Sequence, residues 1–117
     1  MMLRDNETKA VLRRIRVSPQ KLNLVAAMIR GLHAKRAMDI LLFSKKRISI
    51  DVRKTLQSAI ANAQNNKGLD PNSLYVKESF VGSSIKLRRF SPRGRGRSGS
   101  IVKPFSHLTI VVEERKV

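Results

Sequence analysis

Residues 91–100 read Ser-Pro-Arg-Gly-Arg-Gly-Arg-Ser-Gly-Ser and include no large apolar side chain. A stretch of this kind cannot join a hydrophobic core, and it is longer than a tight hairpin turn needs. No acidic residue occurs between positions 79 and 112, although seven cations do: Lys86, Arg88, Arg89, Arg93, Arg95, Arg97 and Lys103. Their counterions must come from another molecule, so the fold has to present this stretch outside the core.

The whole chain is strongly basic. It has 25 Lys and Arg against 8 Asp and Glu, a formal net charge of +17 over 117 residues. A small domain with this charge repels itself, and a polyanion relieves the repulsion. Nucleic acid is the first interpretation and an anionic membrane the second, while a solvated basic loop without a partner is the alternative to both. Aromatic residues make up only 4%, which argues against a base-stacking sheet surface.

Several classes of protein are excluded or disfavoured. The absence of cysteine excludes disulfides, thiol catalysis and cysteine-ligated zinc. No apolar run is long enough to span a bilayer, and the first seven residues do not resemble a signal peptide. Neither His33 nor His107 has a partner at metal-ligand spacing. We therefore expect no metal, no cofactor, no membrane contact and a location in the cytoplasm, or in an organelle of bacterial descent.

An enzyme is the least favoured class. The eight acidic residues are scattered, and no two of them resemble a general acid–base pair. An RNA-processing enzyme would need a carboxylate beside His107, and the nearest in sequence, Glu113, lies too far along a strand to form a dyad. We therefore predict no catalytic residues.

Apolar periodicity predicts a strand over residues 8–17, with Val11, Ile15 and Val17 on one side. A first helix is predicted to begin at Ser18-Pro19 and to end before Gly31, with a core face of Leu22, Val25, Ala26 and Ile29. A second is predicted over about 34–42, with a stripe of Ala34, Ala37, Met38 and Leu41. Ser44 is expected to cap a third that ends near Gly68, with Ile48, Val52, Leu56, Ala59 and Ala63 at helical spacing.

From Leu74 the apolar period becomes two, which predicts strands. Leu74, Val76 and Phe80 fall on one side of the first, and Tyr75 and Val81 on the other. The Gly82-Ser83-Ser84 sequence predicts a bulge or kink. Residues 101–113 are predicted to form the returning strand, with one face made of Leu108, Ile110 and Val112.

These elements predict one α+β domain. We expect three helices packed on a small antiparallel three-stranded sheet, with two strands extended into a long basic β-hairpin. The globular body would comprise residues 8–84 and 104–113, and the hairpin residues 85–103. Arms of about nine residues would extend on the order of 30 Å.

The choice of residues in the hairpin favours RNA. Between Leu87 and Val102 every cation is arginine. Its planar guanidinium binds phosphate in a fork and stacks on bases. Gly94, Gly96 and Gly99 let the backbone approach a crowded surface. If about seven phosphates are neutralised, log K should fall against log salt with a slope of about −5 to −6.

Two further basic groups precede the hairpin. Lys45, Lys46 and Arg47 follow the expected cap at Ser44, where cations oppose the helix dipole unless a phosphate binds the free N–H groups. A mildly destabilising solvated cluster is the alternative. The second group surrounds the first strand and helix start and comprises Lys9, Arg13, Arg14, Arg16 and Lys21. His107 could donate to RNA or be an ordinary strand residue. The predicted RNA-binding residues are Lys9, Arg13, Arg16, Lys21, Lys45, Lys46, Lys86, Arg88, Arg89, Arg93, Arg95, Arg97, Lys103 and His107.

Six short motifs occur in an order that identifies a family. They are Val17-Ser18-Pro19-Gln20-Lys21, Leu24-Val25 with Ile29-Arg30-Gly31, Ser58-Ala59-Ile60-Ala61-Asn62-Ala63, Leu74-Tyr75-Val76-Lys77-Glu78, Pro92-Arg93 with Gly96-Arg97, and Ser106-His107-Leu108-Thr109-Ile110-Val111-Val112. From about Lys9 to Val112 the chain resembles the bacterial large-subunit ribosomal protein twenty-two family. Ser100 and Pro104 depart from this pattern, standing where the family usually has basic residues, and Phe105 stands where it usually has Thr.

The resemblance implies a structural component of the large ribosomal subunit. Such proteins bind large-subunit ribosomal RNA, lie beside neighbouring ribosomal proteins and assist assembly, and their hairpin lines the nascent-peptide exit tunnel. The tip that would face the nascent peptide comprises Arg93, Gly94, Arg95, Gly96, Arg97 and Ser98. The Leu87-Arg88-Arg89 step matches the arm segment tied in the family to macrolide response. We expect no homo-oligomer.

A free DNA-bending protein with basic β-arms is the alternative function. Such arms often have a proline at the tip that wedges between base steps, and Pro92 could act in this way. Pro104 removes one ladder donor, so we expect the returning arm to be irregular there or to be an edge.

Overall fold

The computed structural model describes the backbone of residues 3–15, 17–83, 87–93, 97–103 and 106–115, and side chains at 3–13, 15, 17–82 and 106–115. Several residues singled out in the sequence lie outside the described backbone, namely Arg16, Ser84, Lys86, Gly94, Arg95, Gly96, Pro104 and Phe105. The irregularity expected at Pro104 is among the untested predictions.

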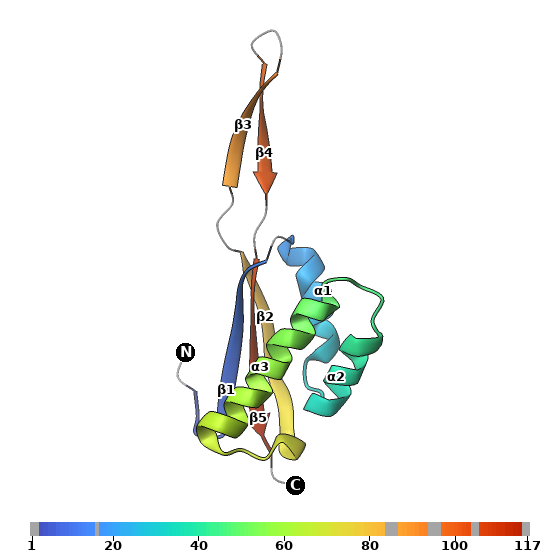
Figure 1. Cartoon of the computed structure of the whole chain (residues 1–117), viewed down its shortest axis with the longest axis vertical. Helices are drawn as coiled ribbons and strands as arrows, with labels where there is room; N and C mark the ends of the chain where they lie inside the picture. The colour runs from blue at the N-terminus through green and yellow to red at the C-terminus, as the bar shows by residue number, and fades with distance from the viewer. Residues whose placement is uncertain (1–2, 16, 84–86, 94–96, 104–105, 116–117) are drawn as a thin grey trace.

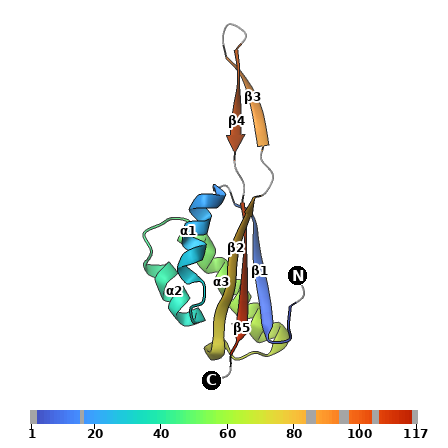
Figure 2. The same ribbon diagram turned by 180° about the vertical axis from the view of Figure 1, so that it is seen from behind.

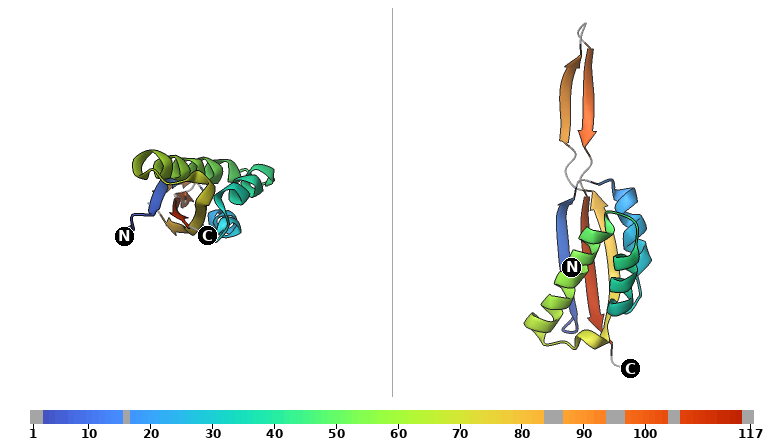
Figure 3. Two further views of the ribbon diagram at one scale, coloured as in Figure 1. Left: turned by 90° about the horizontal axis from the view of Figure 1, so that it is seen from below. Right: turned by 45° about the vertical axis from the view of Figure 1, so that its right-hand side comes forward.

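The body is a three-stranded antiparallel sheet covered on one face by three helices, as predicted (Figures 1 and 3). Strand β5 (Ser106–Glu114) lies between β1 (Glu7–Ile15) and β2 (Leu74–Ser83). The helices are α1 (Pro19–Ile29), α2 (Ala34–Phe43) and α3 (Ser49–Lys67), and a short 3-10 turn (Pro71–Ser73) precedes β2. Helix α3 packs over β1 and β5, α1 packs over β2 and β5, and α2 lies against both helices.

The predicted helix faces form the core. The buried set includes the α1 face and the three predicted β5 residues, namely Leu22, Val25, Ala26, Ile29, Leu108, Ile110 and Val112. The Ser18 hydroxyl accepts from the backbone N–H of Lys21 at 3.4 Å and caps α1, as predicted. Helix α3 ends at Gly68, whose φ of +62° is the left-handed conformation that favours glycine. Helix stripe and stop signals were therefore correct for these elements.

Two predicted strand faces were wrong for the same reason. Val11 and Phe80 are each 38% exposed, whereas Ala10 and Ser79 beside them are buried. The pairing register shifts between Leu12 and Ile15 in β1 and between Val76 and Glu78 in β2. A shift of one residue moves every later side chain to the other face, so strict alternation cannot hold across either strand.

Strand β2 has an irregularity that was not predicted, between Val76 and Glu78. Gly82 and Ser83 pair in register with His107 and Ser106, so there is no bulge at these two residues. The register shift instead lies where the α1–α2 connection joins the outer edge of β2. There the Gly31 N–H donates to the Val76 carbonyl at 2.9 Å, and the Val76 N–H donates to the Leu32 carbonyl at 2.8 Å.

The predicted start of α3 was wrong. Ser44 ends α2, and its hydroxyl accepts from the Lys46 N–H at 3.3 Å within the connection. Helix α3 begins only at Ser49, where the buried serine follows a tight turn. Lys45, Lys46 and Arg47 consequently precede the helix and do not oppose its dipole from within the first turn.

Strands β3 (Leu87–Arg93) and β4 (Arg97–Lys103) form a separate two-stranded antiparallel sheet. Figures 1 and 2 place it beyond one end of the body, and the molecule measures 67 × 31 × 19 Å. Pairing continues through Pro92 opposite Ser98 to Arg93 opposite Arg97. Residues 91–93 and 97–100 therefore belong to the ladder although they lack large apolar side chains, because backbone hydrogen bonds alone form it.

The end of the body away from β3 and β4 has its own ion-pair network. The Lys77 ammonium donates to the Glu7 carboxylate at 2.6 Å and lies 3.8 Å from that of Glu113. Arg115 pairs with Glu113 at 3.2 Å. The hydrogen bond from Lys77 holds the pKa of the buried Glu7 carboxyl below its ordinary value of 4.5, although burial acts in the opposite direction.

Glu7→Gln is expected to weaken the pH dependence of stability in acid. Because the pKa of Glu7 is lower in the folded chain, its stabilising contribution is complete above 4.5 and is lost as the pH falls through the folded value. Urea unfolding at about pH 6 and about pH 3 should therefore show a smaller loss of stability for this variant than for the wild type. Asp39→Asn, which removes an exposed carboxylate outside the network, is the matched control. Equal losses of stability in Glu7→Gln and in the wild type would contradict a stabilising interaction between Glu7 and Lys77.

Candidate nucleic-acid interface

One end of the body gathers cations from three elements. The end of β1 and the N-terminal ends of α1 and α3 lie at the end where β2 leads toward β3 (Figures 1 and 3). We call this the hairpin end. Five exposed cations lie there, on β1, α1 and the α2–α3 connection, and we call them the shoulder: Arg13, Lys21, Lys45, Lys46 and Arg47.

The two ends of the body differ in how their charges are balanced. Among the described side chains every ion pair involves Glu7 or Glu113, and both lie at the end opposite the hairpin end. No shoulder cation has a carboxylate within 4.0 Å in this part of the chain, although Asp51 stands in the first turn of α3. The shoulder cations therefore have no nearby carboxylate among the described side chains to neutralise them.

Hydrogen bonds to backbone carbonyls hold the shoulder segments in place. The buried Ser106 hydroxyl donates to the Val17 carbonyl at 2.6 Å, which ties the start of α1 to the start of β5. The Lys46 carbonyl accepts from the Ser49 N–H at 3.1 Å, and the Arg47 carbonyl from the Ile50 N–H at 3.2 Å. These bonds occupy two of the N–H groups at the start of α3. The sequence suggested a phosphate bound by free N–H groups at this helix start. The N–H groups of Ser49 and Ile50 are not free to bind it, because they already donate to backbone carbonyls.

Lys9 and His107 lie on the sheet, Lys9 in the first half of β1 and His107 near the start of β5 at the hairpin end. Lys9 is exposed on β1 opposite Val111, and its carbonyl accepts from the Asn62 side chain on α3 at 3.2 Å. His107 is half-buried in β5 and lies opposite Gly82. Their contact with RNA stays a prediction, and so does that of every other residue in the predicted set.

The cations of β3 and β4 are placed by register only. Arg88 lies opposite Val102, Arg89 opposite Ile101, and Leu87 opposite Lys103. Arg93 lies opposite Arg97, and like charges at directly opposite positions destabilise a strand pair. This pair favours an external anion at the distal end of the ladder. Pro92 belongs to β3 and lies opposite Ser98, and its role as a wedge in bent DNA stays a prediction.

Two further polar residues have structural roles, and for His33 the sequence predicted a helix cap or a surface position. His33 caps α2 by accepting from the Lys35 N–H at 3.2 Å, so its other ring nitrogen donates to the Asn72 carbonyl at 2.6 Å. Arg30 donates to the Ser79 carbonyl and to the Asn23 side chain, each at 2.6 Å. Neither is available as a free contact for nucleic acid without breaking these bonds.

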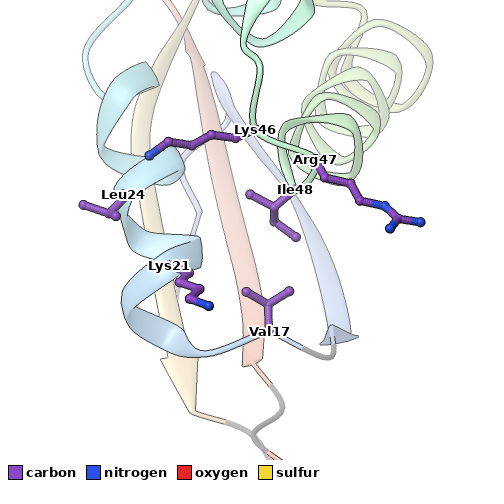
Figure 4. A pocket seen from close by; sticks show the side chains of 6 residues that line it. All are labelled: Val17, Lys21, Leu24, Lys46, Arg47 and Ile48. Carbon is purple, nitrogen blue, oxygen red and sulfur yellow. The ribbon is translucent and has the colours of Figure 1, made fainter.

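Sequence reasoning missed a hollow in the shoulder. A cavity of about 420 Å³ lies between α1 and the α2–α3 connection (Figure 4), lined by Val17, Lys21, Leu24, Lys46, Arg47 and Ile48. The motif run at 17–21 and the basic run at 45–47 were each noticed, but nothing in their spacing shows that they meet. Arg47 was also left out of the predicted RNA-binding set.

Two searches of the described residues are negative. They hold no group of three or more His, Asp or Glu side chains that could ligate a metal ion. No helix among them has the length and apolarity needed to cross a bilayer.

Comparison with known proteins identifies the family. The model of the family described as ribosomal protein L22p/L17e matches residues 10–113. The chain belongs to the ribosomal protein L22p/L17e family. The resemblance inferred from the six motifs is thereby confirmed.

Relatives agree with this assignment over almost the whole chain. The large ribosomal subunit protein uL22 of Methylocella silvestris is 62% identical over 112 residues, which are 96% of this chain and 88% of that protein. The protein of the same name from Sinorhizobium medicae is 64% identical over 96% of this chain and 87% of its own length. That of Rhodopseudomonas palustris strain HaA2 is 62% identical over 97% and 88%. The L22p/L17e match includes the shoulder and both sheets.

Substitution at Gly82 tests how tightly the end of this L22p/L17e sheet is packed. A Cβ atom at Gly82 would collide with Nε2 of His107, so the imidazole covers the glycine. Gly82→Ala is expected to cost roughly 1–3 kcal/mol of unfolding free energy, because the ring must move. The cost should largely disappear in the His107→Ala background, as a double-mutant cycle in urea would show. Equal costs in both backgrounds would contradict this contact.

Proposed function

We propose that this chain is a structural constituent of the large ribosomal subunit that binds large-subunit ribosomal RNA and has no enzymatic activity. The observation that supports this most strongly is the unequal charge balance of the two ends. At the end opposite the hairpin end, Lys77 and Arg115 pair with Glu7 and Glu113, whereas the exposed shoulder cations and the two arginine-containing strands β3 and β4 lie at the other end. A phosphate-rich partner at that end would neutralise them.

The proposal assigns different roles to two parts of one domain. The body, residues 8–84 and 104–113, would lie on the RNA through the shoulder and Lys9. The hairpin, residues 85–103, would extend body strands into the RNA and line the nascent-peptide exit tunnel with the tip from Arg93 to Ser98. Further partners would be neighbouring ribosomal proteins and the nascent peptide, and the chain would work in ribosomes of the cytoplasm without forming homo-oligomers.

The proposed RNA contacts divide by the chemistry of the side chains. Lysines in the set are suited to single phosphates, and the arginines of the hairpin to forked phosphate binding or stacking on bases. Contacts of the first kind add affinity without sequence preference. The position of the chain in the particle would then follow from the fit of the hairpin into folded RNA.

Affinity purification tests the function directly. Tagged full-length chain should recover large subunits in near-stoichiometric amount. The purified chain should bind large-subunit RNA with a log–log salt slope of about −5 to −6 if about seven phosphates are neutralised. Recovery of chromosomal DNA in place of large subunits would instead support the DNA-bending alternative. A slope near zero would contradict phosphate binding.

Deleting residues 91–100 separates the two proposed parts. The body should keep its cooperative unfolding transition, because its core residues lie in β1, β2, β5 and the helices. Large subunits containing the shortened chain should respond differently to macrolides and to nascent peptides that act within the tunnel. An unfolded truncated chain would show that the division into body and hairpin is wrong.

A further inference from the structure

The shoulder cavity combines an apolar wall with cations from two separate segments. Val17 and Ile48 are half-buried and pack on the core, and Leu24 is 59% exposed. Lys21 is on α1, whereas Lys46 belongs to the connection that precedes α3. Residues 17–24 and 46–48 are brought together only by the packing of α1 against α3 and the sheet.

The close view shows how the cations are arranged around this wall. The Lys46 side chain extends from the connection across to α1 on one side of Leu24, and Lys21 lies on the other side of Leu24 (Figure 4). The guanidinium of Arg47 points away from α1, so only the stem of this residue lines the cavity. None of the three has a carboxylate partner among the described side chains. The cavity thus has a mainly apolar wall, with the side chains of Lys21 and Lys46 at its edge.

We propose that this cavity holds one unpaired nucleotide of an RNA. Its base would lie on the apolar wall of Val17, Leu24 and Ile48, and its phosphate would be bound by Lys21 and Lys46. The volume of about 420 Å³ falls within the range of small-molecule pockets. Sequence-specific RNA recognition typically targets unpaired bases that are splayed out of the RNA helix. This inference rests on the proposed RNA binding and adds a base contact to what would otherwise be phosphate contacts alone.

An acidic peptide with an apolar anchor is the competing occupant. The nucleotide is favoured because one ligand then satisfies both features, a flat apolar base and a single dianion or diester between two lysines. The neighbouring Lys45 and the outward guanidinium of Arg47 also extend the positive surface beyond the cavity, as a continuing phosphate backbone requires.

Methyl and amide NMR of the full-length chain tests this with defined probes. Adenosine monophosphate should shift the methyl signals of Val17, Leu24 and Ile48 in a saturable manner. Ribose 5-phosphate and inorganic phosphate should leave these methyl signals in place, because they lack the base. Lys21→Gln and Lys46→Gln should each weaken nucleotide binding roughly threefold, and the double variant about tenfold, as expected for exposed charge contacts.

A matched variant controls for total charge. Lys54→Gln removes a cation from an exposed position of α3 that does not line the cavity, and it should bind the nucleotide as the wild type does. Glutamine has a helix propensity close to that of lysine, so α1 and α3 should remain intact in these variants.

The outcomes separate this inference from the proposed function. Unmoved methyl signals, or shifts spread evenly over the basic surface, would overturn the nucleotide pocket. So would an acetyl-Glu-Leu-Glu-amide peptide that moves these signals where the nucleotide does not. If the same preparation still binds large-subunit RNA with the expected salt slope, the proposed function stands and the pocket alone fails. If the wild-type chain did not bind large-subunit RNA, both the proposed function and the nucleotide pocket would be contradicted.

Discussion

The fold depends on strand β5, which pairs with both other strands of the body sheet. Leu108, Ile110 and Val112 form the sheet side of the core beneath the helices, and Val111 on the opposite face is buried as well. The same strand begins where β4 of the outer ladder has just ended. Pairing on both sides of β5 therefore fixes the point from which the hairpin leaves the body and, through the Ser106–Val17 bond, the start of α1.

The two ends of β5 differ in how the charges near them are balanced. At the far end a buried carboxylate, Glu7, is stabilised by Lys77, and the neighbouring cations have internal partners. At the hairpin end the cations are exposed and lack such partners among the described residues. One end thus contributes to folding, while the other retains a repulsion that a polyanion would relieve. Under the proposed function, this division gives the body one end for its own stability and one end for RNA.

Sequence patterns predicted the parts of the fold that depend on a single segment. Helix faces, the Ser18 cap and the Gly68 stop follow from residues within a few positions of each other, and each was correct. The faces of Val11 and Phe80 were wrong because a register shift is set by the partner strand and the α1–α2 connection. The start of α3 was wrong because Ser44 can cap a turn as readily as a helix.

The candidate site shows the same limit. Its cations could be listed from the sequence, because their number and the lack of nearby acids are visible there. The sequence could not show that Lys21 and Lys46 line one cavity, because residues 17–24 and 46–48 meet only through tertiary packing. The order of the six motifs identified the family, although the geometry of the site could not be inferred from the sequence.

Site-specific photocrosslinking in intact large subunits tests the central claim, that the hairpin end faces RNA and the far end does not. A photoreactive residue would be placed at position 46 or 93 at the hairpin end, and at position 67 at the far end, where Lys67 donates to the Glu7 carbonyl. The account predicts crosslinks to large-subunit RNA from 46 and 93, and far fewer from 67. Equal RNA crosslinking from all three positions, or none from 46 and 93, would contradict it.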